Sequence, residues 1–148
     1  MEYTNKEIVL SWKDIDTLIE NVCKKININL KKDHLENYEI IAITNGGIIP
    51  ATIISYKTGI KNINLFPMIN KKILYNKIPF FDTSKFYLLI DEIYDTGKTF
   101  HKTSTYLTFV NHLDIFLLKR YNSSSSSNHI YGKILKDSRW VVFPWEKP

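Results

Sequence analysis

One apolar run without polar alternation, Phe86–Ile90, constrains the fold more than any other feature of this sequence. A strand that is apolar at every position has to be covered on both faces, which is typical of a parallel sheet with helices on either side. Further strand-like runs, at Tyr38–Ile43, Ile63–Phe66 and Leu113–Leu118, alternate with helix-like segments. The sequence therefore predicts an α/β fold with a mainly parallel central sheet flanked by helices.

A helix is expected to begin at Ser11, whose hydroxyl is suited to cap it, with Asp14 at the spacing of a capping box. An apolar stripe at helical spacing follows. Its members are Trp12, Ile15, Leu18, Ile19, Val22, Cys23 and Ile26. Because Cys23 lies on this stripe, we interpret it as a core residue and not as a nucleophile.

Glycine, proline and polar residues that interrupt the apolar pattern indicate the secondary structure of the other segments. Ile48–Lys57 predicts a helix that ends at Gly59 in the left-handed conformation, and a further helix is expected over Gly97–Val110. Met68–Lys85 mixes Lys, Asn and Pro with apolar residues, which predicts a mobile loop or a short hairpin. The aromatic stretch Arg139–Trp145 is expected to close over part of the molecule.

The size and composition indicate a single globular domain. The chain has 148 residues, of which 44% are apolar and 24% charged. No apolar run approaches the roughly 20 residues of a membrane span, and residues 1–14 carry charges where a signal peptide would be apolar. The only cysteine, Cys23, excludes an intramolecular disulfide. A cytoplasmic protein without membrane contact is expected, and the serines at 123–127 predict a flexible surface loop.

The charge favours anionic partners. Twenty Lys and Arg residues against fifteen Asp and Glu leave a formal net charge of +5. The basic residues are dispersed in pairs, namely Lys24-Lys25, Lys31-Lys32, Lys71-Lys72 and Lys119-Arg120. Because a nucleic-acid groove usually shows clustered basic residues, we interpret the pairs as solvated surface and expect no nucleic-acid partner.

The residues that follow the central apolar run carry the chemistry. Asp91 and Glu92 come directly after it, Asp95 follows, and a turn then opens a helix. The turn consists of Thr96, Gly97, Lys98 and Thr99. Backbone N–H groups at such a helix start favour a phosphate, while the carboxylates suit sugar hydroxyls and a Mg²⁺ ion held partly through water. A turn that merely caps a helix is the alternative, but the order of strand, acids, turn and helix favours a ligand site.

Gly97-Lys98-Thr99 also resembles part of a P-loop. That motif requires a glycine five residues before its Gly-Lys pair, where this sequence has Glu92. A P-loop is therefore excluded.

The string from Leu88 to Thr99 resembles the phosphoribosyl-diphosphate (PRPP) signature of type I phosphoribosyltransferases. Ile40–Ala51 is similar to the loop of that family that holds pyrophosphate, and Ile115–Lys119 to the strand that presents a base-recognising lysine. Trp140–Trp145 resembles the C-terminal tail of xanthine-guanine phosphoribosyltransferases, in which an aromatic ring covers the purine. The resemblance spans nearly the whole chain and is strongest at Asp91–Thr99.

The resemblance implies one phosphoribosyltransferase domain over residues 1–148, with a flexible loop at about 68–85 and a small hood and tail at about 120–148. It implies transfer of the 5-phosphoribosyl group from PRPP to a 6-oxopurine (guanine, xanthine or hypoxanthine), which yields a nucleoside 5′-monophosphate and pyrophosphate. Mg²⁺ would be the cofactor, and a homo-oligomer, dimer or tetramer, would be the assembly.

The resemblance also implies a role for each site residue. Asp91 and Glu92 would bind the ribose hydroxyls and the water shell of the metal, and Asp95 would exchange a proton with the purine. Lys119 would donate to the 6-oxo group. The 5′-phosphate would bind to Thr96, Gly97, Lys98 and Thr99. The pyrophosphate would bind to Thr44, Asn45, Gly46 and Gly47. The purine would bind to Lys119, Trp140 and Val141.

Several positions depart from the family pattern and leave alternatives open. Asn45 stands where the purine enzymes usually carry a basic residue, and Tyr94 where an aliphatic residue is more common. A neutral amide donates hydrogen bonds but supplies no countercharge. One alternative is a non-catalytic descendant that binds PRPP or a nucleotide, as a regulator or an RNA-binding module; another is an enzyme for a different base. Taken alone, Lys119 is equally well a surface residue, and an isolated tryptophan such as Trp140 is more often a core residue.

Overall fold

A five-stranded parallel sheet forms the centre of the structure, which is a computed structural model that describes residues 1–121 and 128–147. The strand order is β4-β3-β7-β8-β9, and every pairing is parallel. The strands are β3 (Tyr38–Ile43), β4 (Ile63–Phe66), β7 (Phe86–Tyr94), β8 (Asn111–Arg120) and β9 (His129–Leu135). The predicted fold class is confirmed, while the expected serine loop at 123–127 lies outside the described residues.

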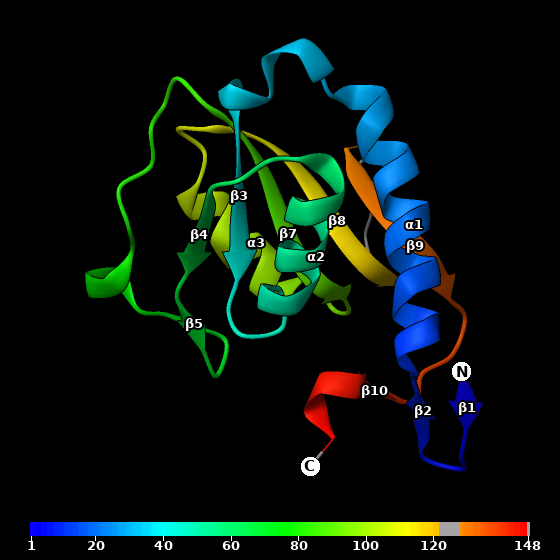
Figure 1. The fold of residues 1–148 in the computed structure, drawn as a ribbon. Coiled ribbons are helices and arrows are strands. Elements are labelled where there is room, and N and C mark those ends of the chain that lie inside the picture. Colours follow the sequence, from blue (N-terminus) through cyan, green and yellow to red (C-terminus); the bar gives the residue numbers. More distant parts are fainter. Residues whose placement is uncertain (122–127, 148) are drawn as a thin grey trace.

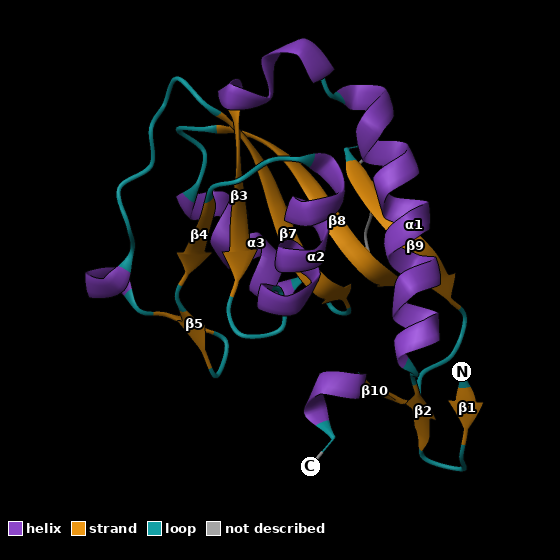
Figure 2. Ribbon diagram, in the orientation of Figure 1, coloured by secondary structure: helices purple, strands orange, loops and turns teal. Residues whose placement is uncertain are grey.

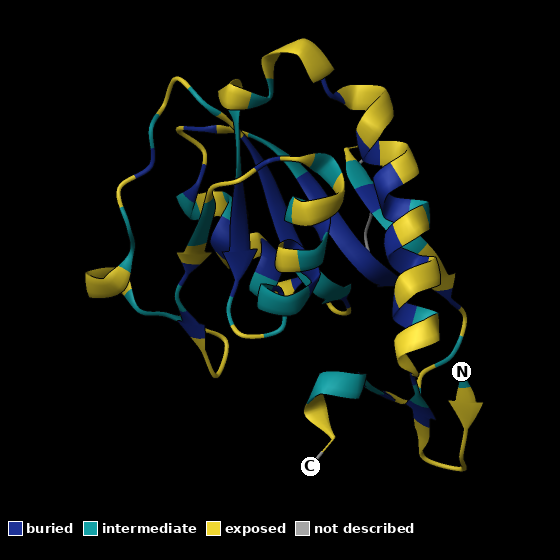
Figure 3. Cartoon of the chain, in the orientation of Figure 1, coloured by how far each residue is buried: buried dark blue, intermediate teal, exposed yellow. Residues whose placement is uncertain are grey.

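Helices cover both faces of this sheet, α1 (Trp12–Asn29) and α2 (Ile48–Thr58) one face and α3 (Lys98–Tyr106) the other (Figures 1 and 2). Alternate residues of β3 pack against the helices on opposite faces of the sheet, because successive side chains of a strand point in opposite directions. Ile40 packs in the core beneath α1 and α2, whereas Ile41 packs with Phe100 of α3. The central strands are accordingly buried along most of their length (Figure 3).

The first long helix follows the prediction at its start. Ser11 caps α1, its hydroxyl accepts a hydrogen bond from the Asp14 N–H at 3.2 Å, and the Asp14 carboxylate accepts one from the Ser11 N–H at 2.8 Å. Cys23 is buried in the core, as predicted. The prediction for Trp12 is wrong: its side chain is half exposed, and its ring lies beside that of Trp145 with 6.0 Å between centroids.

The segment at 68–85 begins with a short hairpin, one of the two forms expected for it. Its strands are β5 (Met68–Ile69) and β6 (Lys72–Ile73), and a 3-10 turn, η2 (Tyr75–Lys77), follows. Asn70 and Lys71 at the tip both have positive φ, 49° and 60°. Elsewhere, η1 (Lys32–Asn37) connects α1 to β3, and Gly59 ends α2 in the left-handed conformation, as predicted.

Both ends of the chain form a second, smaller sheet, which we call the terminal sheet. It consists of β1 (Glu2–Tyr3), β2 (Glu7–Val9) and β10 (Trp140–Val142), with β10 parallel to β2, and the turn η3 (Pro144–Glu146) follows it. The segment expected as a hood, about 120–148, therefore divides: β9 joins the central sheet, and only the part after it joins the terminal sheet. Among the described residues, no helix is long and apolar enough to cross a bilayer.

Candidate active site

Two loops that follow neighbouring strands meet at the carboxyl edge of the sheet. Loop 44–47 follows β3, and loop 95–97 follows β7. The chain passes from β3 outward to β4 and then returns to β7 on the other side of β3, so the strand order reverses between β3 and β7. In open α/β sheets, ligands bind in the crevice at such a switch point.

Loop 44–47 is held by its neighbours. The Thr44 N–H donates to the Phe66 carbonyl at 3.1 Å, and the Thr44 hydroxyl accepts from the Met68 N–H at 2.9 Å. The peptide bond between Thr44 and Asn45 is cis. A Cβ atom at Gly47 would meet the carbonyl oxygens of Ile43 and Ile90, so this position accepts only glycine without a backbone shift.

The acidic pair and the predicted pyrophosphate loop line the same cavity, of about 300 Å³. Asp91 and Glu92 lie within β7 and not after it, because pairing with β8 continues to Tyr94. The lining residues are Thr44, Asn45, Gly46, Met68, Ile69, Asn70, Lys71, Asp91, Glu92 and Thr99. The structure thus brings together residues from three of the segments that the sequence predicted to bind one ligand.

Burial dominates the electrostatics of the two acids. It raises the pKa of Asp91 well above its usual range, the charge of Glu92 raises it further, and a hydrogen bond from the Glu92 N–H at 2.8 Å opposes both. Burial and the charge of Glu146 raise the pKa of Glu92 from 4.5 to about 7, against a hydrogen bond from Trp145. Among the described residues neither carboxylate forms an ion pair, so burial leaves both short of the solvation that a charged carboxylate needs.

The residues present fit a metal ion that takes only part of its coordination from the protein. Within the described parts of the chain, no group of three His, Cys, Asp or Glu side chains could hold a metal ion. However, Oε2 of Glu92 is buried without a hydrogen-bond partner, and its carboxylate lies where a Cβ atom of Gly46 would be. Mg²⁺ commonly uses one or two carboxylates together with waters and phosphate oxygens, which this pair would allow.

The turn after β7 presents backbone donors at the start of α3. Gly97 has a φ of 86° and precedes the first helical residue, Lys98, so the first N–H groups of α3 have no acceptor within the helix. The Thr96 hydroxyl accepts from the Lys98 N–H at 3.4 Å. Tyr94 is buried beneath this turn, where its ring packs against Phe100 and Phe116. The turn has the geometry expected for an anion site.

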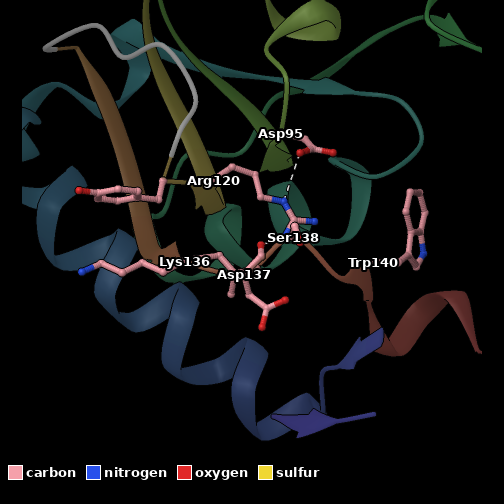
Figure 4. A pocket seen from close by; sticks show the side chains of 8 residues that line it. Asp95, Arg120, Lys136, Asp137, Ser138 and Trp140 are labelled. Atoms are coloured by element: carbon pink, nitrogen blue, oxygen red, sulfur yellow. Dashed lines mark hydrogen bonds and ion pairs between the residues drawn. The ribbon is translucent and has the colours of Figure 1, made fainter. Parts of the chain in front are cut away.

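A second, larger pocket of about 710 Å³ lies beside Asp95 (Figure 4). Its lining residues are Asp95, Arg120, Tyr121, Leu135, Lys136, Asp137, Ser138 and Trp140. The Arg120 Nε donates to Oδ1 of Asp95 at 3.2 Å, and its two terminal nitrogens donate to the carbonyl oxygens of Asp137 and Arg139. The Trp140 ring stands apart on the far side of this pocket and is largely exposed.

The structure does not bring Lys119 into this pocket. Lys119 is only 4% exposed and lies on the face of β8 opposite Arg120, with its Nζ 3.5 Å from His129 Nδ1 and near the rings of Tyr94 and Tyr131. Burial lowers the pKa of its ammonium group. Val141 is also buried, paired with Ile8 of β2. The resemblance assigned the contact with the base to Lys119, whereas the member of the basic pair that lines this pocket is Arg120. Strand alternation places neighbouring residues on opposite faces but does not fix which of them faces the pocket.

Comparison with known proteins identifies the fold. No protein-family model matches the chain, and no curated protein matches its sequence. A purine phosphoribosyltransferase from Pyrococcus horikoshii OT3 superposes with a TM-score of 0.74 and 22% identity over 96% of this chain and 95% of the other. A xanthine-guanine-hypoxanthine phosphoribosyltransferase from Helicobacter pylori gives 0.76 and 17% identity over 95% and 93%.

A hypothetical protein from Neisseria gonorrhoeae, solved with bound ppGpp, gives a TM-score of 0.73 and 19% identity over 99% of this chain and 92% of the other. The three matches cover almost the full length of each protein. The chain therefore has the type I phosphoribosyltransferase fold, as the sequence resemblance predicted.

Proposed function

We propose that this protein is a phosphoribosyltransferase that transfers the 5-phosphoribosyl group from PRPP to a 6-oxopurine, namely guanine, xanthine or hypoxanthine. The observation that carries the proposal is the shared cavity of loop 44–47, Asp91, Glu92 and Thr99, next to the anion-binding turn at 96–99. This arrangement offers separate places for the two phosphate-bearing ends of PRPP with acidic side chains between them. Cytoplasmic location and homo-oligomeric assembly stay predictions.

In this reaction the bond between C1 of the ribose and a pyrophosphate oxygen breaks while a bond from C1 to a purine nitrogen forms. The ribose acquires oxocarbenium character, and negative charge gathers on the leaving pyrophosphate. Mg²⁺ held by Asp91 and Glu92 would supply charge neutralisation at the pyrophosphate. The N–H groups of the turn 96–99 would bind the 5′-phosphate, and loop 44–47 the pyrophosphate.

Asp95 is the proposed proton acceptor for the purine. Its side chain is 54% exposed and lies in the larger pocket, where Arg120 donates to one of its carboxylate oxygens. A carboxylate in this place would take the proton that the purine nitrogen loses as the new bond forms. Trp140 at the edge of the pocket would stack on the base. The basic side chains that line this pocket are Arg120 and Lys136, so we place the 6-oxo group near them and not near Lys119.

The proposal is tested by incubating the protein with PRPP, Mg²⁺ and each of guanine, xanthine, hypoxanthine and adenine while following pyrophosphate release. Turnover with a 6-oxopurine and little with adenine is expected. Asp95→Asn should lower kcat about 100-fold, the usual scale of general acid–base catalysis, and leave the Kd for PRPP within about twofold. Equal losses in kcat and in PRPP affinity would contradict the proposed role of Asp95 in proton transfer.

A second candidate function is nucleotide binding without catalysis. Two observations favour it: the neutral Asn45 in loop 44–47, and the structural similarity to a protein solved with bound ppGpp. A regulator of this kind would bind PRPP or a guanine nucleotide saturably but release no pyrophosphate with any base. An RNA-binding module would instead show RNA affinity that falls steeply with salt concentration.

A further inference from the structure

Tyr94 lies directly beneath the turn 96–99, which we assign to the 5′-phosphate. It is the last residue of β7, and its side chain is only 2% exposed. A Cβ atom placed on Gly97 would lie 2.6 Å from the Tyr94 Oη, so the hydroxyl is in close contact with the backbone of the turn. The residues on either side of Gly97, Thr96 and Lys98, are exposed. Tyr94 therefore supports the turn from inside, while its outer side faces solvent.

The ring of Tyr94 is fixed by contacts from several elements. It packs against Phe100 of α3, Phe116 of β8 and His129 of β9, with centroid distances of 5.6, 5.1 and 5.0 Å. The Lys119 Nζ lies over the ring, 5.3 Å from its centroid. A ring that is packed on so many sides has little freedom to shift, so the core sets the position of its hydroxyl.

The hydroxyl is also joined to His101 of α3. The Tyr94 Oη and the His101 Nε2 are 3.4 Å apart and share a hydrogen bond. The hydroxyl can donate to an unprotonated Nε2 or accept from a protonated one, so either tautomer of the imidazole keeps the bond. The backbone N–H of His101 donates to the Gly97 carbonyl at 2.8 Å. His101 thus connects Tyr94 to the turn through its side chain and its backbone.

We infer that Tyr94 is a positioning residue of the 5′-phosphate site, which acts on the turn 96–99 through its hydroxyl and His101. The inference deepens the proposed function and rests on it. Gly97 has a φ of 86°, and a glycine loses more conformational freedom on ordering than any other residue. A hydroxyl held against Gly97 restricts this freedom before the ligand arrives. The N–H groups at the start of α3 then bind the phosphate with a smaller loss of entropy.

Tyr87 provides a matched control for the loss of a buried hydroxyl. It is the second residue of the same strand, at the opposite end from the turn, and is 1% exposed. Its hydroxyl donates to the Asp82 carbonyl at 3.1 Å. Tyr94→Phe and Tyr87→Phe each keep the aromatic ring and remove one hydrogen-bonded oxygen. A difference between the two variants therefore reports the contact with the turn and not the loss of a polar group from the core.

The experiment measures binding of guanosine 5′-monophosphate and of inorganic pyrophosphate by calorimetry, both with Mg²⁺. The nucleotide tests the turn 96–99, whereas pyrophosphate tests loop 44–47. We expect Tyr94→Phe to weaken nucleotide binding about fivefold, the scale of one hydrogen bond, and to change pyrophosphate affinity less than about twofold. Tyr87→Phe should leave both affinities within about twofold of the wild type. Thermal unfolding of each variant verifies that the fold is kept.

His101→Ala tests whether the effect depends on the hydrogen bond. Tyr94→Phe and His101→Ala remove the same bond, so the double variant should bind the nucleotide about as well as the weaker of the two single variants. Steady-state kinetics give a second readout. The KM for PRPP should rise about fivefold in Tyr94→Phe while kcat stays within about twofold, because the 5′-phosphate is held equally in the substrate and in the transition state.

The outcomes separate the two claims. Equal effects of Tyr94→Phe and Tyr87→Phe, or equal weakening of both ligands by Tyr94→Phe, would overturn the role of Tyr94 and leave the proposed function standing. Additive losses in the double variant with His101→Ala would show that the two side chains act independently, which also contradicts the inference. A wild type that binds the nucleotide without turnover would remove the proposed catalysis alone, because the main readout is binding. Failure of the wild type to bind PRPP or any nucleoside monophosphate would remove both.

Discussion

Arg120 joins the proposed proton acceptor to the segment that precedes the terminal sheet. Its side chain is only 13% exposed and donates at once to the Asp95 carboxylate and to the carbonyl oxygens of Asp137 and Arg139. A planar guanidinium can make all these bonds from one rigid group, whereas the ammonium of a lysine acts as a compact point charge. The orientation of Asp95 therefore depends on residues far along the chain through a single side chain.

Arg120→Lys should keep the charge beside Asp95 but lose the bridging geometry. We expect kcat for phosphoribosyl transfer to fall about tenfold while the Kd for PRPP changes less than about twofold, because the side chain orients Asp95 and does not touch the phosphates. Arg120→Gln, which also loses the charge, should fall further. Steady-state kinetics and calorimetry give the two quantities.

Arg139→Gln is the control for this prediction. Arg139 also links parts of the chain near the terminal sheet, through the Asp137 carboxylate and the Thr4 carbonyl at 2.7 Å. Among the described residues its side chain forms no hydrogen bond or ion pair with Asp95. The kcat of Arg139→Gln should stay within about threefold of the wild type. The interactions that are lost are the partly buried ion pair with Asp137, the hydrogen bond to Thr4 and the contact with the Tyr3 ring, none of which involves Asp95. If Arg139→Gln and Arg120→Lys lose activity equally, the effect comes from general loosening and not from Asp95.

At the scale of single residues, the sequence located the site but not every side chain that faces it. Asp91, Glu92, Asp95 and Thr99 were predictable because they follow the apolar run Phe86–Ile90 at short fixed distances along the chain and need no distant partner. Lys71 was not, because its place depends on which two short strands pair to form the hairpin. Such pairings are decided by tertiary contacts and leave little pattern in so short a segment.

At the scale of elements, the buried centre of the sheet was predictable and its ends were not. The prediction for β7 ended at Ile90, where apolar character stops, yet pairing with β8 carries the strand through the acids to Tyr94. The edge strand β9 was missed because few of its residues are buried, among them Ile130 and Leu135. An edge strand has a partner on one side only, so its sequence is less constrained by burial than that of a central strand.

Loop 44–47 offers a prediction at this scale through its two glycines. A methyl group at Gly47 would meet the backbone carbonyl oxygens of Ile43 and Ile90, whereas one at Gly46 would meet only the Glu92 carboxylate. Gly47→Ala should therefore lower the free energy of unfolding by about 1–3 kcal/mol, the usual cost of overpacking. Gly46→Ala should cost less than about 1 kcal/mol, because a side chain moves more easily than backbone.

The two variants should rank in the reverse order in their effect on Glu92: Gly46→Ala should disturb this side chain more than Gly47→Ala does. Gly46→Ala displaces the Glu92 carboxylate, so it should weaken Mg²⁺-dependent PRPP binding in a protein that remains stable. Urea denaturation and calorimetry measure the two effects separately. Equal losses of stability in both variants would show that Glu92 is not free to move, contrary to this interpretation.

At the scale of the whole molecule, the C-terminal turn of the chain meets the central sheet at Glu92. The terminal sheet joins β2 to β10, and the turn η3 then brings Trp145 to hydrogen-bond Glu92 and Glu146 near enough to raise its pKa. The Trp145 ring stacks on Phe143, with 4.9 Å between centroids. The C-terminal turn that covers Glu92 is thus anchored through β10 to β2, near the start of the chain.

The raised pKa of Glu92 predicts how stability depends on pH. Its pKa is 4.5 when unperturbed and about 7 in the fold, so between these values the folded protein binds more protons than the unfolded chain. The contribution of Glu92 to the free energy of unfolding therefore decreases as the pH rises from about 5 to 7, by on the order of 1–3 kcal/mol. Asp14 and Asp137, with pKa values lowered to about 2, change stability only below about pH 4, outside this range.

His129 opposes this trend, because burial lowers its pKa and such a group adds stability as the pH rises. The comparison that isolates Glu92 is therefore between the wild type and Glu92→Gln, which both keep His129. Urea denaturation from pH 5 to pH 8 should show the variant gaining stability relative to the wild type as the pH rises, since glutamine carries no charge to bury. Parallel curves for the two proteins would mean that Glu92 ionises as readily in the folded protein as in the unfolded chain. That result would contradict the desolvated acidic pair on which the proposed metal site depends.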